Sequence, residues 1–269
     1  GGDSLSALDE QRLEQGVLQV ISAANGGHKP LGTSSSRECL TMLRRICKYA
    51  AHLHLMRSME IFVKLPRMEA KQTKPFSAQE QTALRDFVLA APTPRKVGLL
   101  LQMQLGLRIG EVCGLQWGDF DFKSGILTVQ RTVSRIYCGT GCTKIVVQTP
   151  KTKSSGREIP IPHDLAALLR KLRGNASPDT WFLSGSTERP VEPRCYRKSI
   201  RGYLRRAGVR RVHPHALRHT FATTCLQSGC DIKTLSEILG HADANVTLKR
   251  YVHTDMKRKK TEMQRVFSA

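Results

Sequence analysis

Three short segments of this sequence carry side chains suited to the chemistry of a phosphodiester. Breaking such a bond without hydrolysis needs a nucleophile, cations around the non-bridging oxygens and a proton donor for the leaving 5′-oxygen. In the first segment, PHALRHTFATT, His215 and Arg218 stand three residues apart, so a helix brings both side chains to one face. An arginine fork binds two phosphate oxygens at once. We expect this pair to bind a phosphate, although an isolated HxxR is more often a surface or packing feature.

The second segment, LGLRIGEVCGLQWGDFD at 105–121, sets Arg108 among apolar residues. A charge in such surroundings needs a partner, and Glu111 is the nearest candidate. Two interpretations are open. Glu111 forms an ordinary ion pair with Arg108, or it braces Arg108 while the guanidinium binds a phosphate.

The third segment, LGHADANVTLKRYVHT, places His241 directly after a glycine and Tyr251 ten positions later. A tyrosine hydroxyl has a pKa of about 10, so nearby positive charge or a base must help it to attack at neutral pH. The surroundings of Tyr251 are cationic, which makes it the candidate nucleophile. For any single tyrosine, an amphipathic packing residue is the alternative interpretation.

The charge of the chain indicates what such a site acts on. Its 269 residues have a formal net charge of +21, which favours a polyanionic partner, and nucleic acid is the first candidate. An anionic membrane surface is the competing interpretation. No apolar run approaches the roughly 20 residues that span a bilayer, and no signal peptide is visible, so we expect no membrane partner.

Eight cysteines are scattered mostly among apolar neighbours, as reduced thiols of an intracellular protein are. We therefore expect an intracellular protein with no disulfide framework. Cys138 and Cys142, in CGTGC, are able to pair or to hold a metal, but no second ligand pair stands at zinc-finger spacing. A glycine-rich hairpin tip is the preferred interpretation, and no metal site is expected.

Helices are the main elements expected to position these residues. Helical spacing is clearest in the segment 4–61, and Ser77 with Glu80 forms a capping-box pattern that opens a helix. Strand-like runs at 126–133, 144–148 and 158–161 predict a small antiparallel sheet. From His163 onward the pattern is again helical, with GLLLQMQLGL as a buried helix before the strands.

The sequence thus predicts a mainly α fold with a small antiparallel β-sheet, an α+β protein. The Lys- and Pro-rich stretch KLPRMEAKQTKPF indicates a domain boundary. We expect a helical domain over residues 1–66, a linker over 67–76, and a catalytic domain with a C-terminal tail over 77–269.

The order of Arg108, PKTKSSGREIPIP, HALRH, LGHAD and Tyr251 resembles the tyrosine recombinase family, to which the phage-type integrases belong, from Phe76 to the C-terminus. LGLRIGEVCGLQWGD is similar to the first-arginine box of the family. HALRHTFATTCLQSGCDIKTLSEILGHADANVTLKRYVHT is similar to its second box nearly throughout. The TPKTKSS segment and the step from His241 to Tyr251 look most like integrases of conjugative transposons and phages.

The resemblance implies that Arg108 and Arg218 hold the scissile phosphate, that His215 and His241 donate to it or move protons, and that Tyr251 attacks. The hairpin lysine that protonates the leaving 5′-hydroxyl corresponds to Lys151 by the PKT match, with Lys153 as the alternative. The product is a 3′-phosphotyrosyl link that stores the bond energy, so neither ATP nor a metal nor another cofactor is required. A type IB topoisomerase-like enzyme and a catalytically silent DNA-binding protein of the same fold are the alternatives.

Double-stranded DNA, at attachment sites or element ends, is the partner that the resemblance implies. Residues 1–66 are similar to the DNA-clamping core-binding domain, of which we expect an N-terminal piece to be missing. A homo-oligomer on DNA, dimer to tetramer, with exchange of C-terminal tails, and an accessory DNA-bending or excision factor are further expectations. The basic side chains expected at DNA are Arg44, Arg45, Lys153, Arg157, Arg194, Arg197, Lys198, Arg205, Arg206, Arg210 and Arg211.

Overall fold

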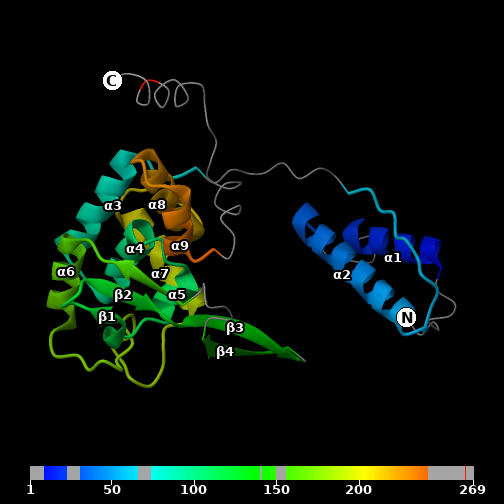
Figure 1. The fold of residues 1–269 in the computed structure, drawn as a ribbon, viewed down its shortest axis with the longest axis horizontal. Helices are drawn as coiled ribbons and strands as arrows, with labels where there is room; N and C mark the ends of the chain where they lie inside the picture. The colour runs from blue at the N-terminus through cyan, green and yellow to red at the C-terminus, as the bar shows by residue number, and fades with distance from the viewer. Residues whose placement is uncertain are drawn as a thin grey trace. The chain divides into compact units, whose positions relative to one another are not determined.

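The computed structural model describes residues 9–22, 31–65, 74–139, 141–149, 156–241 and 264. The chain is divided into two compact units, Gly1–Gln72 and Thr73–Ala269 (Figure 1). The division falls inside the stretch 67–76 that the sequence analysis assigned to a linker. The assignment of the first unit as a core-binding domain stays a prediction.

The first unit is a helix pair, α1 (Glu10–Ser22) and α2 (Thr33–His52). Leu40 and Cys47 of α2 are buried with Ile61, because the chain after α2 runs back along the pair. Backbone N–H groups of this returning segment donate to carboxylates of α1, at 3.1 Å from Glu60 to Glu10 and 2.6 Å from Phe62 to Glu14.

The helical pattern over 4–61 therefore holds for two helices and is wrong after α2. His54 adopts φ +56°, a left-handed conformation that ends helical geometry. The segment that follows contributes Ile61 to the core from extended chain.

The second unit is built around α4 (Pro94–Gln104), in which every residue from 97 to 103 is buried. Helix α3 (Ala78–Ala90) begins at the expected capping box. The Ser77 side chain accepts from the Glu80 N–H at 3.2 Å, and the Glu80 carboxylate accepts from the Ser77 N–H at 2.8 Å. Around these helices lie α5 (Ile109–Cys113), the 3-10 turn η2 (Trp117–Asp119), α6 (His163–Arg173), α7 (Pro193–Arg206), α8 (His215–Gln227) and α9 (Ile232–Leu239).

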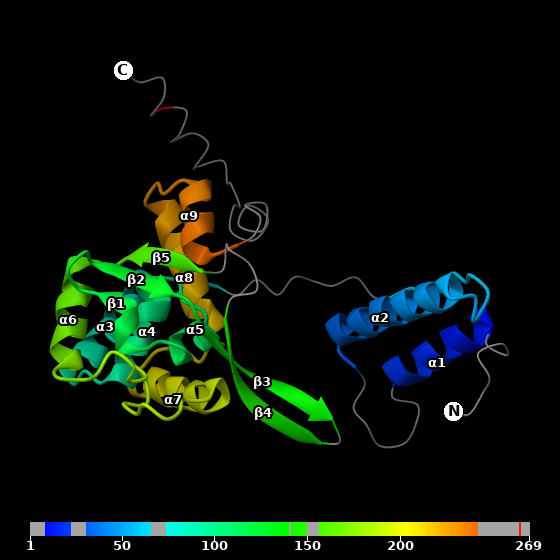
Figure 2. The same ribbon diagram turned by 60° about the horizontal axis from the view of Figure 1, so that its bottom comes forward.

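The strands form two small sheets where the sequence predicted one. β1 (Phe120–Asp121), β2 (Ile126–Val129) and β5 (Arg157–Pro160) make an antiparallel sheet in the order β1-β2-β5. β3 (Thr132–Gly139) and β4 (Cys142–Gln148) pair only with each other among the described residues. Their ribbon extends away from the helices of the unit in both views (Figure 2).

The run 126–133 is consequently two strands rather than one. It breaks because Gln130 and Arg131 turn to the buried carboxylate of Asp119, which accepts from Gln130 Nε2 at 2.7 Å and from Arg131 Nη2 at 2.6 Å. The broader expectation, a mostly helical protein with small antiparallel sheets, is confirmed. No helix in the described ranges is long and apolar enough to cross a membrane.

Candidate active site

Arg108 lies at the N-terminal boundary of α5, and Glu111 lies in its first turn. The Arg108 backbone N–H and its Nη1 both donate to the Glu111 carboxylate, at 2.8 and 2.7 Å. The Arg108 side chain remains 39% exposed, whereas Glu111 is buried. The ion pair expected from the sequence is present, and the Arg108 side chain stays partly accessible.

A second arginine binds the same carboxylate. Arg157, the first residue of β5, donates from Nη1 to Glu111 Oε1 at 3.0 Å and from Nη2 to Glu111 Oε2 at 2.9 Å. Burial alone would raise the pKa of Glu111, but the hydrogen bonds and charge of Arg157, together with Arg108, lower this pKa to about 2. Glu111 is therefore an anion throughout the physiological range.

This position of Arg157 does not fit the DNA contact that the sequence analysis expected. Its side chain is 6% exposed, and its Nε is also engaged, donating to the Ile238 carbonyl at 2.6 Å. The Arg157 side chain is buried because its guanidinium binds Glu111, which lies 46 residues away in the sequence. We correct the assignment of Arg157 from a DNA contact to support of the site.

Arg218 is buried in α8, at 1% exposure. Its Nη1 donates to the Gly106 carbonyl at 2.6 Å, and its Nη2 donates to the Leu239 carbonyl at 2.6 Å. Gly106 has φ +67°, and a Cβ there would lie 2.5 Å from a ring carbon of Phe221. Only glycine suits both conditions, so the loop before Arg108 is shaped to receive Arg218.

The three arginines meet at the C-terminal end of α9. Arg157 binds the Ile238 carbonyl, Arg218 binds the Leu239 carbonyl, and Arg108 binds the Gly240 carbonyl at 3.2 Å. These are the last carbonyls of a helix, which have no partner inside it and lie at the negative end of its dipole. Gly240 ends α9 in the left-handed conformation, with φ +63°.

His241 follows this helix end and joins the cluster. Its Nε2 lies 3.0 Å from Arg218 Nη2. Because arginine is only a donor, Nε2 is the acceptor and the imidazole carries its proton on Nδ1. The structure thus brings together Arg108, Glu111, Arg157, Arg218 and His241, from four elements of the second unit.

Of the other predicted catalytic residues, the structure describes only His215. His215 is the first residue of α8, one turn before Arg218, and it is exposed. Lys151, Lys153 and Tyr251 lie outside the described residues. Their roles, and that of His215, stay predictions.

A cationic face runs along α7. Lys198, Arg201 and Arg205 are exposed at helical spacing, and with Arg211 they line a hollow of about 630 Å³. Arg201 was missed by the sequence analysis, although its spacing of three and four residues from its neighbours was a usable signal. Among the other expected DNA contacts, Arg45, Arg194 and Arg206 are exposed and Arg197 is half-buried.

Two expected DNA contacts have partners within their own unit. Arg44 donates to the Ile61 carbonyl, at 2.7 Å from Nη2. Arg210 forms an ion pair with Glu80 at 2.8 Å and donates to the Lys74 and Pro75 carbonyls at 2.8 and 2.6 Å. Both side chains remain exposed, so a contact with DNA stays a prediction for each.

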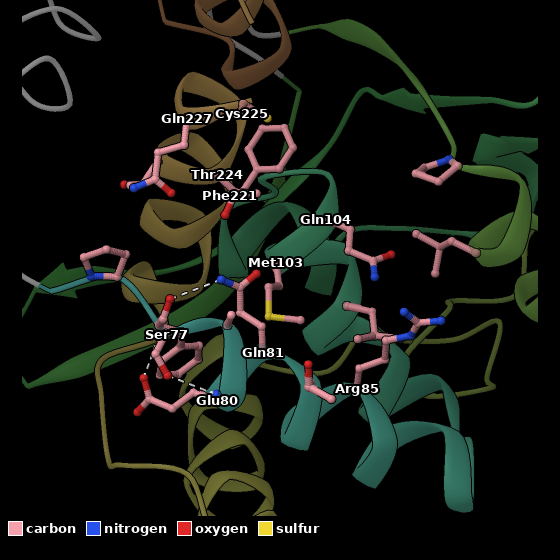
Figure 3. A pocket seen from close by; sticks show the side chains of 18 of the residues that line it. Ser77, Glu80, Gln81, Arg85, Met103, Gln104, Phe221, Thr224, Cys225 and Gln227 are labelled. Atoms are coloured by element: carbon pink, nitrogen blue, oxygen red, sulfur yellow. Dashed lines mark hydrogen bonds between the residues drawn. The ribbon is translucent and has the colours of Figure 1, made fainter. Parts of the chain in front are cut away.

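A larger pocket of about 1200 Å³ lies between α3, α4, α6 and α8 (Figure 3). Ser77, Glu80 and Arg85 line it from the α3 side, and Phe221 and Cys225 line it from α8. None of the arginines at the end of α9 lines it. The described residues that the sequence analysis expected to hold the phosphate, Arg108 and Arg218, thus lie in the arginine cluster and not in this pocket.

The cysteines are all free in the structure, and Cys138 and Cys142 are exposed at the end of the β3–β4 ribbon. In the part of the chain that the structure describes, no group of three or more His, Cys, Asp or Glu side chains is arranged to hold a metal ion.

Comparison with known proteins gives curated relatives of similar sequence and solved structures of similar fold. The chain is 35% identical over 183 residues to a tyrosine recombinase XerC-like protein of Caldanaerobacter subterraneus, covering 61% of this chain and 46% of that protein. It is 26% identical over 185 residues to the transposase from transposon Tn916 of Enterococcus faecalis, covering 62% and 44%. This chain thus spans about half the length of these curated relatives.

Among solved structures, the Tn1549 transposon integrase in complex with a circular intermediate DNA has a similar fold. The TM-score is 0.76 at 21% identity, over 97% of this chain and 86% of that one. A family model described as the phage integrase family matches residues 67–258, which is well over half of the sequence. This chain therefore belongs to the phage integrase family.

Proposed function

We propose that this protein is a site-specific DNA recombinase that cleaves and rejoins strands through a 3′-phosphotyrosyl link formed by Tyr251. Integration and excision of a mobile element is the process that it serves. One observation carries the proposal: Arg108, Arg218 and His241 meet at the end of α9, ten residues before the candidate nucleophile.

The cluster has the charge that a scissile phosphodiester needs. The cluster holds three guanidinium groups and one carboxylate, that of Glu111, which binds Arg108 and Arg157, so a net positive charge remains for an anion. A phosphate oxygen beside His241 replaces the imidazole as acceptor for Arg218 Nη2, while the partly exposed side chain of Arg108 binds a second oxygen. Fixed donors of this kind stabilise the additional negative charge of the transition state.

Acid–base steps fall to the remaining polar residues. Lys151, or Lys153 in its place, donates the proton to the leaving 5′-oxygen, and His215 and His241 donate to the phosphate or move protons. Cleavage conserves the bond energy in the phosphotyrosyl link, so rejoining to a new strand needs no ATP.

Double-stranded DNA is the proposed substrate. The Tn1549 integrase structure is a complex with a circular intermediate DNA, and the cationic face of α7 on this chain supplies side chains for phosphates. A dimer to tetramer on DNA, exchanging the C-terminal tails, and an accessory DNA-bending or excision factor complete the proposed assembly. The bacterial cytoplasm is its proposed location.

A suicide substrate tests the proposal. This is a nicked duplex from which the short 5′-OH fragment diffuses away after cleavage, so the covalent intermediate accumulates. The wild-type chain is expected to form an adduct that survives denaturation, and Tyr251→Phe is expected to bind the duplex normally and to form none. An adduct with Tyr251→Phe refutes the assignment of the nucleophile.

Two further assays separate the alternatives. A recombinase joins strands of two different duplexes, whereas a topoisomerase-like enzyme only relaxes supercoiled DNA. A silent DNA-binding protein gives neither product and no adduct in the wild type. Mapping the covalent position on DNA from element ends identifies the cleaved phosphate.

A further inference from the structure

We propose that Arg157 is a positioning residue for strand cleavage: it holds Glu111, and through it Arg108, in register with the end of α9. The inference rests on the proposed function. It assigns Arg157 no contact with DNA, and its effect on the phosphate passes through Arg108.

The first step is the clamp on Glu111. Arg157 approaches both carboxylate oxygens with two parallel hydrogen bonds of 3.0 and 2.9 Å, while Arg108 takes Oε1 at 2.7 Å. A carboxylate held on both oxygens by a buried fork has no freedom to rotate. The orientation of the carboxylate that holds Arg108 is therefore fixed by Arg157.

The second step is the link to α9. The same guanidinium donates from Nε to the Ile238 carbonyl at 2.6 Å, two residues before the Gly240 carbonyl that accepts from Arg108. A Cβ on Gly240 would lie only 3.0 to 3.2 Å from Nη1, Cδ and Cζ of Arg157, so the helix end packs directly on the arginine. Arg157 thus binds three acceptors with three donors that are fixed in one plane, and a lysine ammonium cannot reproduce this arrangement.

The third step is the place of Arg157 in the chain. It is the first residue of β5, where it pairs with Val129 of β2, and it follows Lys153 by four positions. One buried side chain thus joins the strand that follows the two candidate lysines, the carboxylate that braces Arg108, and helix α9, which His241 follows.

The test compares Arg157→Met, which keeps length without donors, with Arg157→Lys, which keeps the charge without the fork. Arg170→Met is the matched control, since Arg170 is an exposed residue of α6 that donates to the Phe122 carbonyl at 2.8 Å. Adduct formation on the suicide substrate is followed in single turnover, and DNA binding is measured across salt concentrations. Thermal unfolding checks each fold.

Arg157→Met is expected to slow adduct formation by about 100-fold, the loss typical of a small misplacement of reacting groups. Arg157→Lys is expected to recover only part of the wild-type rate of adduct formation, and Arg170→Met is expected to keep the wild-type rate. The slope of log affinity against log salt is unchanged, because no phosphate contact is lost.

A pH profile separates positioning from a merely structural role. Without Arg157, Glu111 stays buried and keeps Arg108 as its one charged partner among the described residues, so its pKa rises. Cleavage by Arg157→Met should then decline as the pH falls, and adding Glu111→Gln should remove that decline. A structural defect alone lowers the rate equally at every pH.

Several results overturn the inference. A folded Arg157→Met that cleaves at the wild-type rate refutes it while leaving the proposed function intact, and so does a salt slope reduced by about 0.9, which marks a phosphate contact. If Arg157→Met does not fold, Arg157→Lys decides: an intact fold with the wild-type rate refutes the inference, and a reduced rate supports it. A wild-type chain that forms no adduct overturns the proposed function and, with it, the inference.

Discussion

Replacing Glu111 with glutamine removes one negative charge at nearly constant volume, and the structure gives the size of the effect. The pKa of Glu111 is about 2, against an ordinary value of 4.5, because Arg157 and Arg108 outweigh the cost of burial. At about 1.4 kcal/mol per pKa unit, the ionised Glu111 carboxylate stabilises the folded state by about 3 kcal/mol, net of the cost of its burial. Breaking a buried ion pair by removing one partner costs about 3–5 kcal/mol, which agrees.

The pH dependence of this loss has a definite sign. A carboxyl whose pKa is lower in the folded state contributes its full stability above 4.5 and loses it as the pH falls toward 2. The free-energy difference between wild type and Glu111→Gln should therefore be about 3 kcal/mol at pH 7 and about 2 kcal/mol at pH 3.5.

Urea unfolding followed by tryptophan fluorescence measures this difference. Both tryptophans, Trp117 and Trp181, lie in the same unit as Glu111, so the signal reports on that unit alone. Glu158→Gln is the matched control, because Glu158 is exposed beside Arg157 on β5 and its loss should cost less than about 0.5 kcal/mol. A difference below about 1 kcal/mol at pH 7, or one that does not shrink in acid, refutes the reasoning.

Two other changes test neighbouring features. Gly106→Ala should destabilise the chain by about 2–5 kcal/mol in urea unfolding, because alanine is strained at φ +67° and its Cβ would meet the Phe221 ring at 2.5 Å. Gly202→Ala is the control, because a Cβ there meets open space, and it should not destabilise the chain. Equal losses of unfolding free energy in the two variants would contradict the packing argument. Arg201→Gln should reduce the slope of log affinity for duplex DNA against log salt by about 0.9, measured by fluorescence anisotropy. The exposed Lys171 of α6 provides its control as Lys171→Gln, and an unchanged slope for Arg201→Gln would exclude α7 from the DNA interface at that position.

Local patterns in the sequence were sufficient for most of the helices and for one contact of the site. The capping box at Ser77, the stop of α9 at Gly240 and the Arg108–Glu111 pair each depend on residues within four positions of one another. Such interactions leave a direct trace in residue type and spacing.

The remainder of the site leaves no such trace. Arg108, Arg157 and Arg218 take main-chain carbonyls as acceptors, and every residue has a carbonyl, so no side-chain type marks Ile238 or Leu239 as partners. Arg157 looked like a DNA contact because its neighbours are basic, whereas its actual partner is far along the chain. The strand break at Gln130 was hidden in the same way, since Asp119 acts across the fold.

The hydrogen bonds that the buried arginines form at the end of α9 offset the free-energy cost of burying their charge. An isolated guanidinium at 1% exposure is strongly unfavourable, but Arg218 donates to the carbonyls of Gly106 and Leu239, and the latter, at the end of α9, has no partner inside its helix. The carbonyls hold the cation in place before any anion arrives. Under the proposed function, a phosphodiester entering beside His241 meets donors whose side chains are already ordered, so little conformational entropy is lost on binding. A flexible lysine at position 218 would have to be ordered by the substrate itself, which is why the geometry favours arginine there.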